Sequence, residues 1–460
     1  MAKHSRIAVL DIGKTNIKTV VFDLASEREI DVISKPNAPL PGPPYRHFDT
    51  EAIWNFFRES LATLHERHGF EAISITTHGA CFVLLDENGE LAMPVLDYED
   101  TGPDELADVY NAIRPKFSET GSPRLPMGLN VGAQLHYLAT TFPDAFARAR
   151  WCLPYPQYWA FRLTGEIASE TTSLGVHTDL WNPYANTYSS MVGELGWTRL
   201  MPPIKPASAI LGPLKSDLTA ALGLPSGLPV YSGIHDSNAS LLPHLIARQT
   251  PFSVVSTGTW VIVMSMGGRQ VALDEARDTL INVNALGGPV PSSRFMGGRA
   301  FELSGADSRA EITAADRQRV LGEKVVLLPS LPAGSGPFPD KAARWSVAPE
   351  ALTPGEKLLV VSLYLALMTN VSLDLTGAEG PVVVEGPFSR NEAYLDMLAQ
   401  LRGTRPLKGD SGLTGTSYGA ACLATLESAT AASKSGTMTA KPVEPDPLLL
   451  EYASAWNTRA

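Results

Sequence analysis

The sequence predicts an α/β protein built from two similar halves. Near its start, the apolar strands Ile7–Leu10 and Thr19–Phe22 flank a polar turn that contains a glycine. The segment 252–263 repeats this pattern, with two apolar strands around a turn of small residues. Other short apolar strands alternate with segments of helical periodicity. We therefore expect one half over residues 1–232, a second over 233–433, and a tail over 434–460.

Length and composition support this organisation and exclude some classes of function. A chain of 460 residues is too long for one core, and its 44% hydrophobic and 18% charged residues are typical of a globular protein. A net charge of −11 gives no basic field for nucleic acid. The three cysteines, Cys81, Cys152 and Cys422, form no CxxC pair, which favours a reducing cytoplasm. With no signal peptide before the first strand and no run of about 18 apolar residues, we expect a cytoplasmic protein without membrane contact.

Local patterns then predict the main elements. In the first half these are a helix from Thr50 to His65 with Thr50 as its cap, strands over 72–76 and 81–85, a turn over 86–89 and a helix over 153–163. In the second half they are strands over 229–232 and 382–385, the two strands of 252–263 and a long buried helix over 354–375. The tail beyond about Lys434 is rich in Ala, Ser, Thr and Pro, which predicts partly irregular structure.

The first glycine turn has the chemistry of a phosphate-binding hairpin. Gly13 lets backbone N–H groups approach phosphate oxygens, and Asp11 is a hard oxygen ligand for a magnesium ion or its waters. Thr15, Asn16 and Lys14 add donors in the same turn. The set suits a nucleoside triphosphate held by a hairpin instead of a Walker A loop. An ordinary turn is the alternative, because Asp and Gly are common in turns generally.

Several motifs, in this order and spacing, resemble the FGGY family of carbohydrate kinases, and most closely its rhamnulokinase branch. The matching segments are Asp11 to Lys18, Thr76 to Gly79, Pro94 to Asp100, Gly233 to Asp236, Ser256 to Trp260, Val384 to Asn391 and Thr414 to Ala421. The family's usual glycine pair for adenosine is replaced here by Gly386-Pro387-Phe388.

The resemblance implies two ribonuclease-H-like (actin-like ATPase) domains with a cleft between them. It implies an ATP- and Mg²⁺-dependent kinase that phosphorylates a hydroxyl of a ketose or deoxyketose, such as rhamnulose, fuculose or a pentulose. Magnesium-bound ATP is then expected between the two lobes. The resemblance also suggests a homodimer.

The resemblance also implies a role for individual residues. Asp236 is the expected general base and also contacts the sugar, and Asp11 is the expected metal-side carboxylate. The other expected sugar-binding residues are His78, Gly79 and Asp100. The expected ATP- and phosphate-binding residues are Gly13, Lys14, Thr15, Asn16, Thr257, Gly258, Thr259, Gly386 and Asn391.

Simpler interpretations exist for some of these residues. Asp236 is also a suitable helix N-cap, His78 a suitable buried imidazole, and Asp100 a suitable solvated acid in an acidic loop. For the whole chain, the alternatives are a non-catalytic actin-like protein that binds nucleotide or sugar, and a kinase of the same fold with another acceptor such as a polyol. ATP turnover with and without a panel of sugars separates these alternatives.

Overall fold

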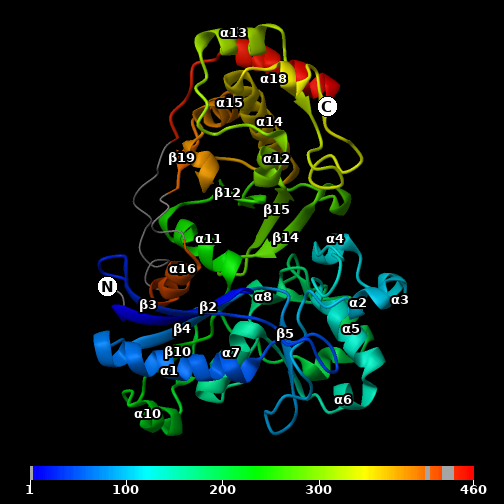
Figure 1. Ribbon diagram of the computed structural model, residues 1–460. Helices are drawn as coiled ribbons and strands as arrows, with labels where there is room; N and C mark the ends of the chain where they lie inside the picture. The colour runs from blue at the N-terminus through cyan, green and yellow to red at the C-terminus, as the bar shows by residue number, and fades with distance from the viewer. Residues whose placement is uncertain (1–3, 410–414, 427–439) are drawn as a thin grey trace. The chain divides into compact units, whose positions relative to one another are not determined.

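The computed structural model describes residues 4–409, 415–426 and 440–460 and divides into two compact units (Figure 1). The first unit contains residues 4–247, 281–289 and 415–426, and the second contains 248–280, 290–409 and 440–460. Each unit is built around a mixed sheet, which agrees with the predicted α/β fold of two similar halves. The division falls after Ala247 and not after residue 232, so Asp236 belongs to the first unit.

The sheet of the first unit has seven strands. Its strands are β1 (Arg6–Ile12), β2 (Asn16–Asp23), β3 (Arg28–Pro36), β4 (Ala72–Thr77), β9 (Ile210–Pro213), β10 (Pro229–Tyr231) and β11 (Ile234–His235). Their order is β3-β2-β1-β4-β10-β9, and β11 also pairs with β4. Strand β1 runs antiparallel to β2 and parallel to β4, with Asp11 opposite Thr76. The carboxyl ends of β1, β4 and β11 therefore meet at one edge of the sheet.

Helices cover both faces of this sheet. The apolar side chains of α1 (Thr50–His68), α7 (Tyr155–Thr164) and α10 (Ser216–Leu222) share a core with Leu10 and Ile12. Helix α16 (Thr416–Cys422) contacts β1 and β4 and packs against α11 (Asp236–Ala247). Because side chains alternate along a strand, Asp11 faces α16 while Leu10 and Ile12 face the core under α1.

The start of α1 differs from the prediction. The Asp49 carboxylate accepts a hydrogen bond from the backbone N–H of Ala52 at 2.9 Å, so Asp49 is the cap. The prediction of Thr50 as the cap is therefore wrong by one residue. Both are capping residue types, and only the backbone geometry decides between neighbours.

The rest of the first unit consists of short elements around a second core. They are β5 (Phe82–Leu85), α2 (Gly102–Glu105), α3 (Ala107–Ile113), α4 (Phe117–Thr120), α5 (Val131–Thr141), α6 (Pro143–Ala147), β6 (Trp151–Pro154), α8 (Thr171–Leu174), β7 (Trp181–Asn182), β8 (Thr187–Tyr188) and α9 (Ser190–Glu194). Strand β5 pairs antiparallel with β6.

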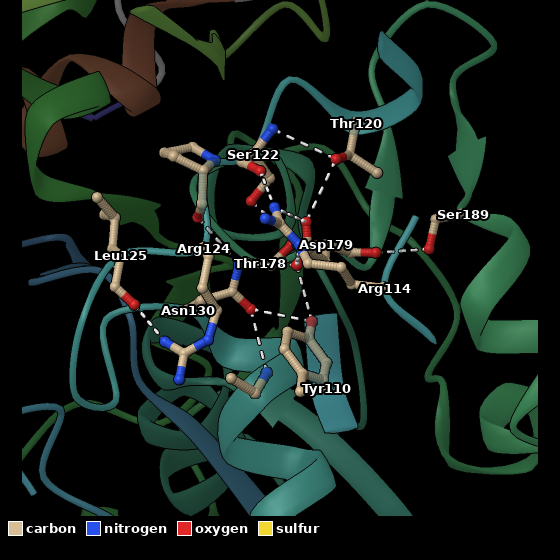
Figure 2. Close-up of polar contacts among 12 residues, drawn as sticks. Tyr110, Arg114, Thr120, Ser122, Arg124, Leu125, Asn130, Thr178, Asp179 and Ser189 are labelled. Atoms are coloured by element: carbon tan, nitrogen blue, oxygen red, sulfur yellow. Dashed lines mark hydrogen bonds and ion pairs between the residues drawn. The ribbon is translucent and has the colours of Figure 1, made fainter. Parts of the chain in front are cut away.

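A buried polar network stabilises this region (Figure 2). Asp179 is fully buried and accepts hydrogen bonds from Tyr110 Oη at 2.7 Å, Asn130 Nδ2 at 2.9 Å and Arg114 Nε at 3.0 Å. Burial raises the pKa of Asp179, and the Arg114 guanidinium opposes that change. The network ties the segment from Tyr110 to Asn130 to the loop at Asp179, and removing one member of such a buried pair is costly.

The sheet of the second unit repeats the arrangement of the first. Its strands are β12 (Phe252–Thr257), β13 (Val261–Met266), β14 (Thr279–Val283), β15 (Pro289–Phe295), β18 (Val382–Glu385) and β19 (Leu407–Lys408), in the order β14-β15-β13-β12-β18-β19. Strand β12 runs antiparallel to β13 and parallel to β18. This is the relation that β1 has to β2 and β4.

Five α-helices and a small strand pair complete the described part of the second unit. They are α12 (Gly297–Ser304), α13 (Ala314–Gly322), α14 (Pro354–Leu375), α15 (Glu392–Arg402), α18 (Pro447–Arg459), β16 (Leu327–Leu328) and β17 (Arg344–Trp345). Helix α14 has the predicted bounds. Among the described residues it is the one helix that is long and apolar enough to span a membrane, but 78% of its apolar stretch is buried. It is accordingly a core helix of this unit.

The end of the chain is more ordered than its composition indicates. Helix α18 buries Tyr452 and Trp456, whose side chains donate to the carbonyls of Val325 at 2.8 Å and Leu327 at 2.7 Å. The prediction of a partly irregular tail did not include this helix at 447–459, and residues 434–439 of that tail lie outside the described residues. Composition missed the helix because two buried aromatic side chains outweigh the surrounding small residues.

Candidate active site

The first glycine hairpin connects β1 to β2 in the first unit. The Gly13 amide donates to the carbonyl of Asn16 at 2.9 Å and closes the turn. A Cβ at position 13 would lie 2.9 Å from that same oxygen, so the turn requires a glycine. The side chains of Thr15 and Asn16 are exposed at its tip, 3.2 Å apart.

Asp11 lies at the base of this hairpin and is only 6% exposed. Its Oδ2 accepts hydrogen bonds from Thr416 Oγ1 at 2.6 Å and Ser417 Oγ at 2.7 Å, and Lys18 Nζ lies 3.3 Å away. The two hydroxyls belong to the first turn of α16, part of the predicted Thr414–Ala421 motif, of which Thr414 lies outside the described residues. The sequence analysis did not connect this motif with Asp11.

Lys14 has different partners from those expected of a phosphate ligand. Its ammonium pairs with Asp97 and lies 3.3 Å from the Glu99 carboxylate. It also lies 4.6 Å from the centre of the Tyr98 ring, which favours a cation. In this structure the charge of Lys14 is therefore directed toward the loop that contains Asp97 and Glu99.

Asp236 lies beside two histidines where β11 passes into α11. His235 Nε2 lies 3.1 Å from Asp236 Oδ1, and the Ser237 amide donates to the same oxygen at 2.6 Å. Burial is the main cause that raises the pKa of Asp236 to about 6, the Asp11 carboxylate adds to the rise, and the hydrogen bonds from Ser237 oppose it. The carboxylate is still 31% exposed. A partly accessible acid with a raised pKa can accept a proton near neutral pH.

The two histidines are neutral and differ in tautomer. Burial lowers the pKa of His235 to about 4, and Asn238 Nδ2 donates to its Nδ1 at 3.3 Å, so Nε2 carries the proton and donates to Asp236. Burial also lowers the pKa of His78, whose Nδ1 lies 2.9 Å from the Gly79 carbonyl and must donate to it. His78 Nε2 is therefore an acceptor, and it is buried without a hydrogen-bond partner among the described residues.

The surroundings of His78 are aromatic. The centres of the Phe48, Tyr98 and Tyr155 rings lie 5.0 Å, 5.4 Å and 5.4 Å from the centre of its ring. The alternative of a fully satisfied buried imidazole does not describe His78, because one ring nitrogen has no partner. Gly79 has a steric role here, since a Cβ at this position would lie 2.6 Å from His235 Nε2.

Asp100, expected at the sugar site, is engaged with the backbone. Its two oxygens accept from the amides of Arg46 and Gly102, each at 2.8 Å. Asp97, three residues earlier, is fully buried and pairs with both Lys14 and Arg46. The sequence analysis missed Asp97, although one acid in the apolar run Pro94-Val-Leu-Asp97 is a signal for a buried charge.

The second glycine hairpin connects β12 to β13 in the second unit. The Gly258 amide donates to the Trp260 carbonyl at 2.9 Å. Thr257 Oγ1 donates to the Glu385 carbonyl and accepts from the Phe388 amide at 3.1 Å. Gly386 has φ of 78°, and a Cβ there would lie 2.0 Å from the Thr257 carbonyl oxygen. The predicted phosphate loop and the predicted adenosine motif are thus one interlocked structure.

A cavity of about 530 Å³ lies beside this structure within the second unit. It is lined by Phe301, Ser308, Ile312, Leu358, Pro387, Phe388, Arg390, Asn391, Glu392 and Ala393. Asn391 is occupied by protein contacts, because it donates to Ser362 Oγ at 2.8 Å and caps α15 by accepting from the Tyr394 amide at 3.1 Å. The sequence analysis missed the lining from α12 to α14, which is far from the motif along the chain.

The residues around Asp11 fit a magnesium ion that arrives with a triphosphate. Among the described residues no three His, Cys, Asp or Glu side chains gather into a metal cluster. Mg²⁺ commonly binds through one or two carboxylates, several waters and the substrate phosphates, so a single aspartate is sufficient. The hydroxyls of Thr416 and Ser417 hold that carboxylate in place.

Two family models together match almost the whole chain. The model of the FGGY family of carbohydrate kinases, N-terminal domain, matches residues 6–243, and the model of carbohydrate kinase FGGY, C-terminal domain, matches residues 249–433. The chain belongs to the FGGY family of carbohydrate kinases. The predicted resemblance and the two-domain fold of this family are confirmed.

Individual relatives agree with the family. An L-fuculokinase from Salmonella typhi is 27% identical over 280 residues, and a rhamnulokinase from Oceanobacillus iheyensis is 27% identical over 203 residues. The match covers 58% of this chain and 58% of the fuculokinase, and 43% of this chain and 42% of the rhamnulokinase. The chain therefore matches only about half the length of these curated relatives.

Solved structures match over the full chain. The crystal structure of a carbohydrate kinase from Novosphingobium aromaticivorans has a TM-score of 0.87 and 34% identity, and covers 98% of this chain and 99% of its own. Plasmodium falciparum glycerol kinase with ADP shares the fold, with a TM-score of 0.77, 15% identity and coverage of 99% and 97%. The first similarity supports the family assignment, and the second shows a shared fold only.

Proposed function

We propose that this FGGY family member transfers the γ-phosphoryl group of ATP to a hydroxyl of an uncharged ketose or deoxyketose. The observation that carries the proposal is Asp236, a partly exposed carboxylate whose pKa is raised to about 6 and whose orientation is fixed by His235 and Ser237. Asp236 would accept the proton of the sugar hydroxyl. That oxygen bonds to the γ-phosphorus as its bond to the β,γ-bridging oxygen breaks, and ADP leaves.

The two hairpins would bind the phosphates. The first would supply N–H and O–H donors from Gly13, Thr15 and Asn16, and Asp11 would hold Mg²⁺, which when bound neutralises phosphate charge. The second would supply Thr257, Gly258 and Thr259, with the adenosine next to Gly386 and Asn391. Lys14 belongs to this set only if phosphate binding releases it from Asp97 and Glu99.

The environment of His78 supports the substrate class. Its Nε2 accepts a hydrogen bond, as does the Asp236 carboxylate, so two acceptors are available to sugar hydroxyls. The rings of Phe48, Tyr98 and Tyr155 offer apolar surface for a methyl group or a C–H face, as in a deoxyketose. The nearby cations that the structure describes are each paired with a carboxylate; they are Lys14, Lys18 and Arg46. This pairing favours an uncharged acceptor over a sugar acid.

A coupled assay of ADP release tests the proposal. The acceptors are rhamnulose, fuculose and pentuloses, with glycerol as the polyol arm and gluconate as the acid arm. We expect turnover with a ketose, and loss of about 10²- to 10⁴-fold in kcat for Asp236→Asn with its fold retained. ATP binding without turnover on any acceptor would instead favour a non-catalytic nucleotide-binding protein.

The buried free cysteines also favour a cytoplasmic location. Light scattering would show whether the protein is a homodimer.

A further inference from the structure

A chain of hydrogen bonds leads from a buried glutamate to the proposed base. Glu170 is 1% exposed, and its carboxylate accepts hydrogen bonds from Thr172, the second residue of α8. Thr172 in turn contacts His235, the neighbour of Asp236. We propose that Glu170 and Thr172 are positioning residues that hold His235, and through it Asp236, in the geometry needed for proton transfer. This inference rests on the proposed function.

The donors and acceptors along the chain have one consistent direction. The Thr172 amide donates to Glu170 Oε1 at 2.8 Å, and the Thr172 hydroxyl donates to Oε2. Because that hydroxyl proton points at Glu170, its oxygen offers a lone pair to the His235 amide, which donates to it at 3.0 Å. The carboxylate thereby orients the hydroxyl, and the hydroxyl anchors the end of β11.

The ring of His235 is held separately from its backbone. Asn238 Nδ2 donates to His235 Nδ1 at 3.3 Å and also lies 3.5 Å from the Thr172 carbonyl. The other edge of the ring packs on Gly79, where no side chain fits. His235 Nε2 is thus directed at Asp236 Oδ1, and a displaced α8 would disturb both its backbone and its side-chain anchors.

Capping of α8 is the purely structural alternative, since Glu170 is the cap of that four-residue helix. A cap needs only an acceptor, and several uncharged residues provide one. The structure instead buries a carboxyl group, and burial raises the pKa of Glu170 to about 7. A costly buried acid that accepts both Thr172 donors is better explained by control of the hydroxyl orientation.

Kinetics of Thr172→Val test the proposal. Valine keeps the shape but removes the hydroxyl, so the His235 amide loses its acceptor. We expect kcat to fall about ten- to a hundredfold with little change in KM for ATP, because a misplaced catalytic group affects the chemical step.

Three further variants sharpen this test. Thr172→Ser should recover most of kcat. Glu170→Gln should show a smaller loss, since the amide NH₂ that replaces one carboxylate oxygen cannot accept from Thr172, while the remaining oxygen still can. Thr19→Val is the matched control, because it removes a buried hydroxyl that bonds Ser60 Oγ at 2.6 Å in the same unit.

A second readout does not depend on kinase activity. Carboxyl ¹³C NMR of the full chain, with Asp236→Asn for assignment, follows the titration of Asp236. Loss of the His235 donor destabilises the ionised carboxylate, so its midpoint should move up by about half a pH unit or more in Thr172→Val, but not in Thr19→Val. An unchanged midpoint and unchanged kcat in Thr172→Val overturn the positioning role. A wild-type protein that phosphorylates no acceptor contradicts the proposed function alone, while the NMR titration still decides the positioning role.

Discussion

The two glycine hairpins share a strand arrangement and differ in charge. In both, an inner strand runs antiparallel to its hairpin partner and parallel to a third strand, and a glycine amide closes the turn at 2.9 Å. Two residues before the glycine, the first hairpin has Asp11 and the second has Ser256. The duplicated fold therefore provides a glycine turn after an equivalent strand in each unit, and only the first contains an acid at this position.

The contacts that hold each hairpin in place differ in the same way. In the first unit, the hydroxyls of Thr416 and Ser417 and the ammonium of Lys18 all contact the Asp11 carboxylate. In the second unit, the Thr257 hydroxyl contacts only backbone groups, of Glu385 and Phe388. One hairpin holds a charge in place, and the other holds a neutral loop in place. This is the division expected if one site binds the metal and the other binds phosphate oxygens through neutral donors.

The largest expected effect comes from the position that differs. Asp11→Asn keeps the shape and removes the charge, so kcat should fall about a hundred- to thousandfold, with a weaker dependence on Mg²⁺ concentration. The matched change, Ser256→Ala in the second hairpin, should alter kcat less than about threefold, because a neutral side chain contributes little to metal binding. Equal losses in both variants, measured as kcat against Mg²⁺, would remove the distinction between the hairpins.

The next effect concerns the backbone that locks the second hairpin. Gly386→Ala places a Cβ 2.0 Å from the Thr257 carbonyl oxygen at a φ of 78° and should destabilise this unit by about 3 kcal/mol or more. Gly403→Ala has a similar φ of 70° with no atom within 4 Å of the added Cβ, so only the backbone strain of about 1 kcal/mol applies. Hydrogen exchange of β12 and β18 measures both. Similar protection in the two variants would show that the contact between Thr257 and Gly386 is unimportant.

Local patterns predicted the elements of both hairpins well. The strands around Gly13 and Gly258 have strong apolar runs and clear turn residues, and α14 and β18 have the predicted bounds. These features depend on short-range periodicity, which the sequence displays directly. The cap of α1 was predicted wrongly and the helix at Trp456 was not predicted, because each depends on packing that a local window does not contain.

The predicted site residues form a less uniform group. Asp11, His78 and Asp236 occur together at the carboxyl ends of β1, β4 and β11 in the first unit, as their positions after strands indicate. The partners of Lys14 and of Asp100 could not be foreseen, since Asp97 and Arg46 reach them through long side chains or loop geometry. Glu170 was missed for the same reason. It acts through Thr172, which lies 63 residues from His235 and 66 residues from Asn238 along the sequence.

The pH dependence of activity links the first hairpin to the base. Asp236 must be ionised to accept a proton, and burial first, then the Asp11 carboxylate, raise its pKa to about 6. We expect kcat/KM to fall about tenfold per pH unit below that value. In Asp11→Asn the acid limb of the residual activity should shift to lower pH, because one cause of the raised pKa of Asp236 is removed. An acid limb that stays in place would assign it to another group. His235, with a pKa of about 4, does not titrate in this range.

The smallest effect is a gain in stability when the base is removed. The pKa of Asp236 is about 6 in the folded protein against a usual value of 3.8, so the folded state binds its proton more tightly than the unfolded state does. This contribution is fully present below about pH 4 and is lost as the pH rises through 6. Asp236→Asn should therefore be more stable than the wild type at pH 7.5 by about 1 kcal/mol, a value reduced because the side chain is 31% exposed, and the gain should vanish at pH 4.

Thermal unfolding at the two pH values measures this difference in stability, with Asp340→Asn as the control for loss of an exposed carboxylate. A variant that is less stable at pH 7.5 would show that Asp236 serves the fold and not the chemistry, and the first unit would then have no strained acid to distinguish it from the second.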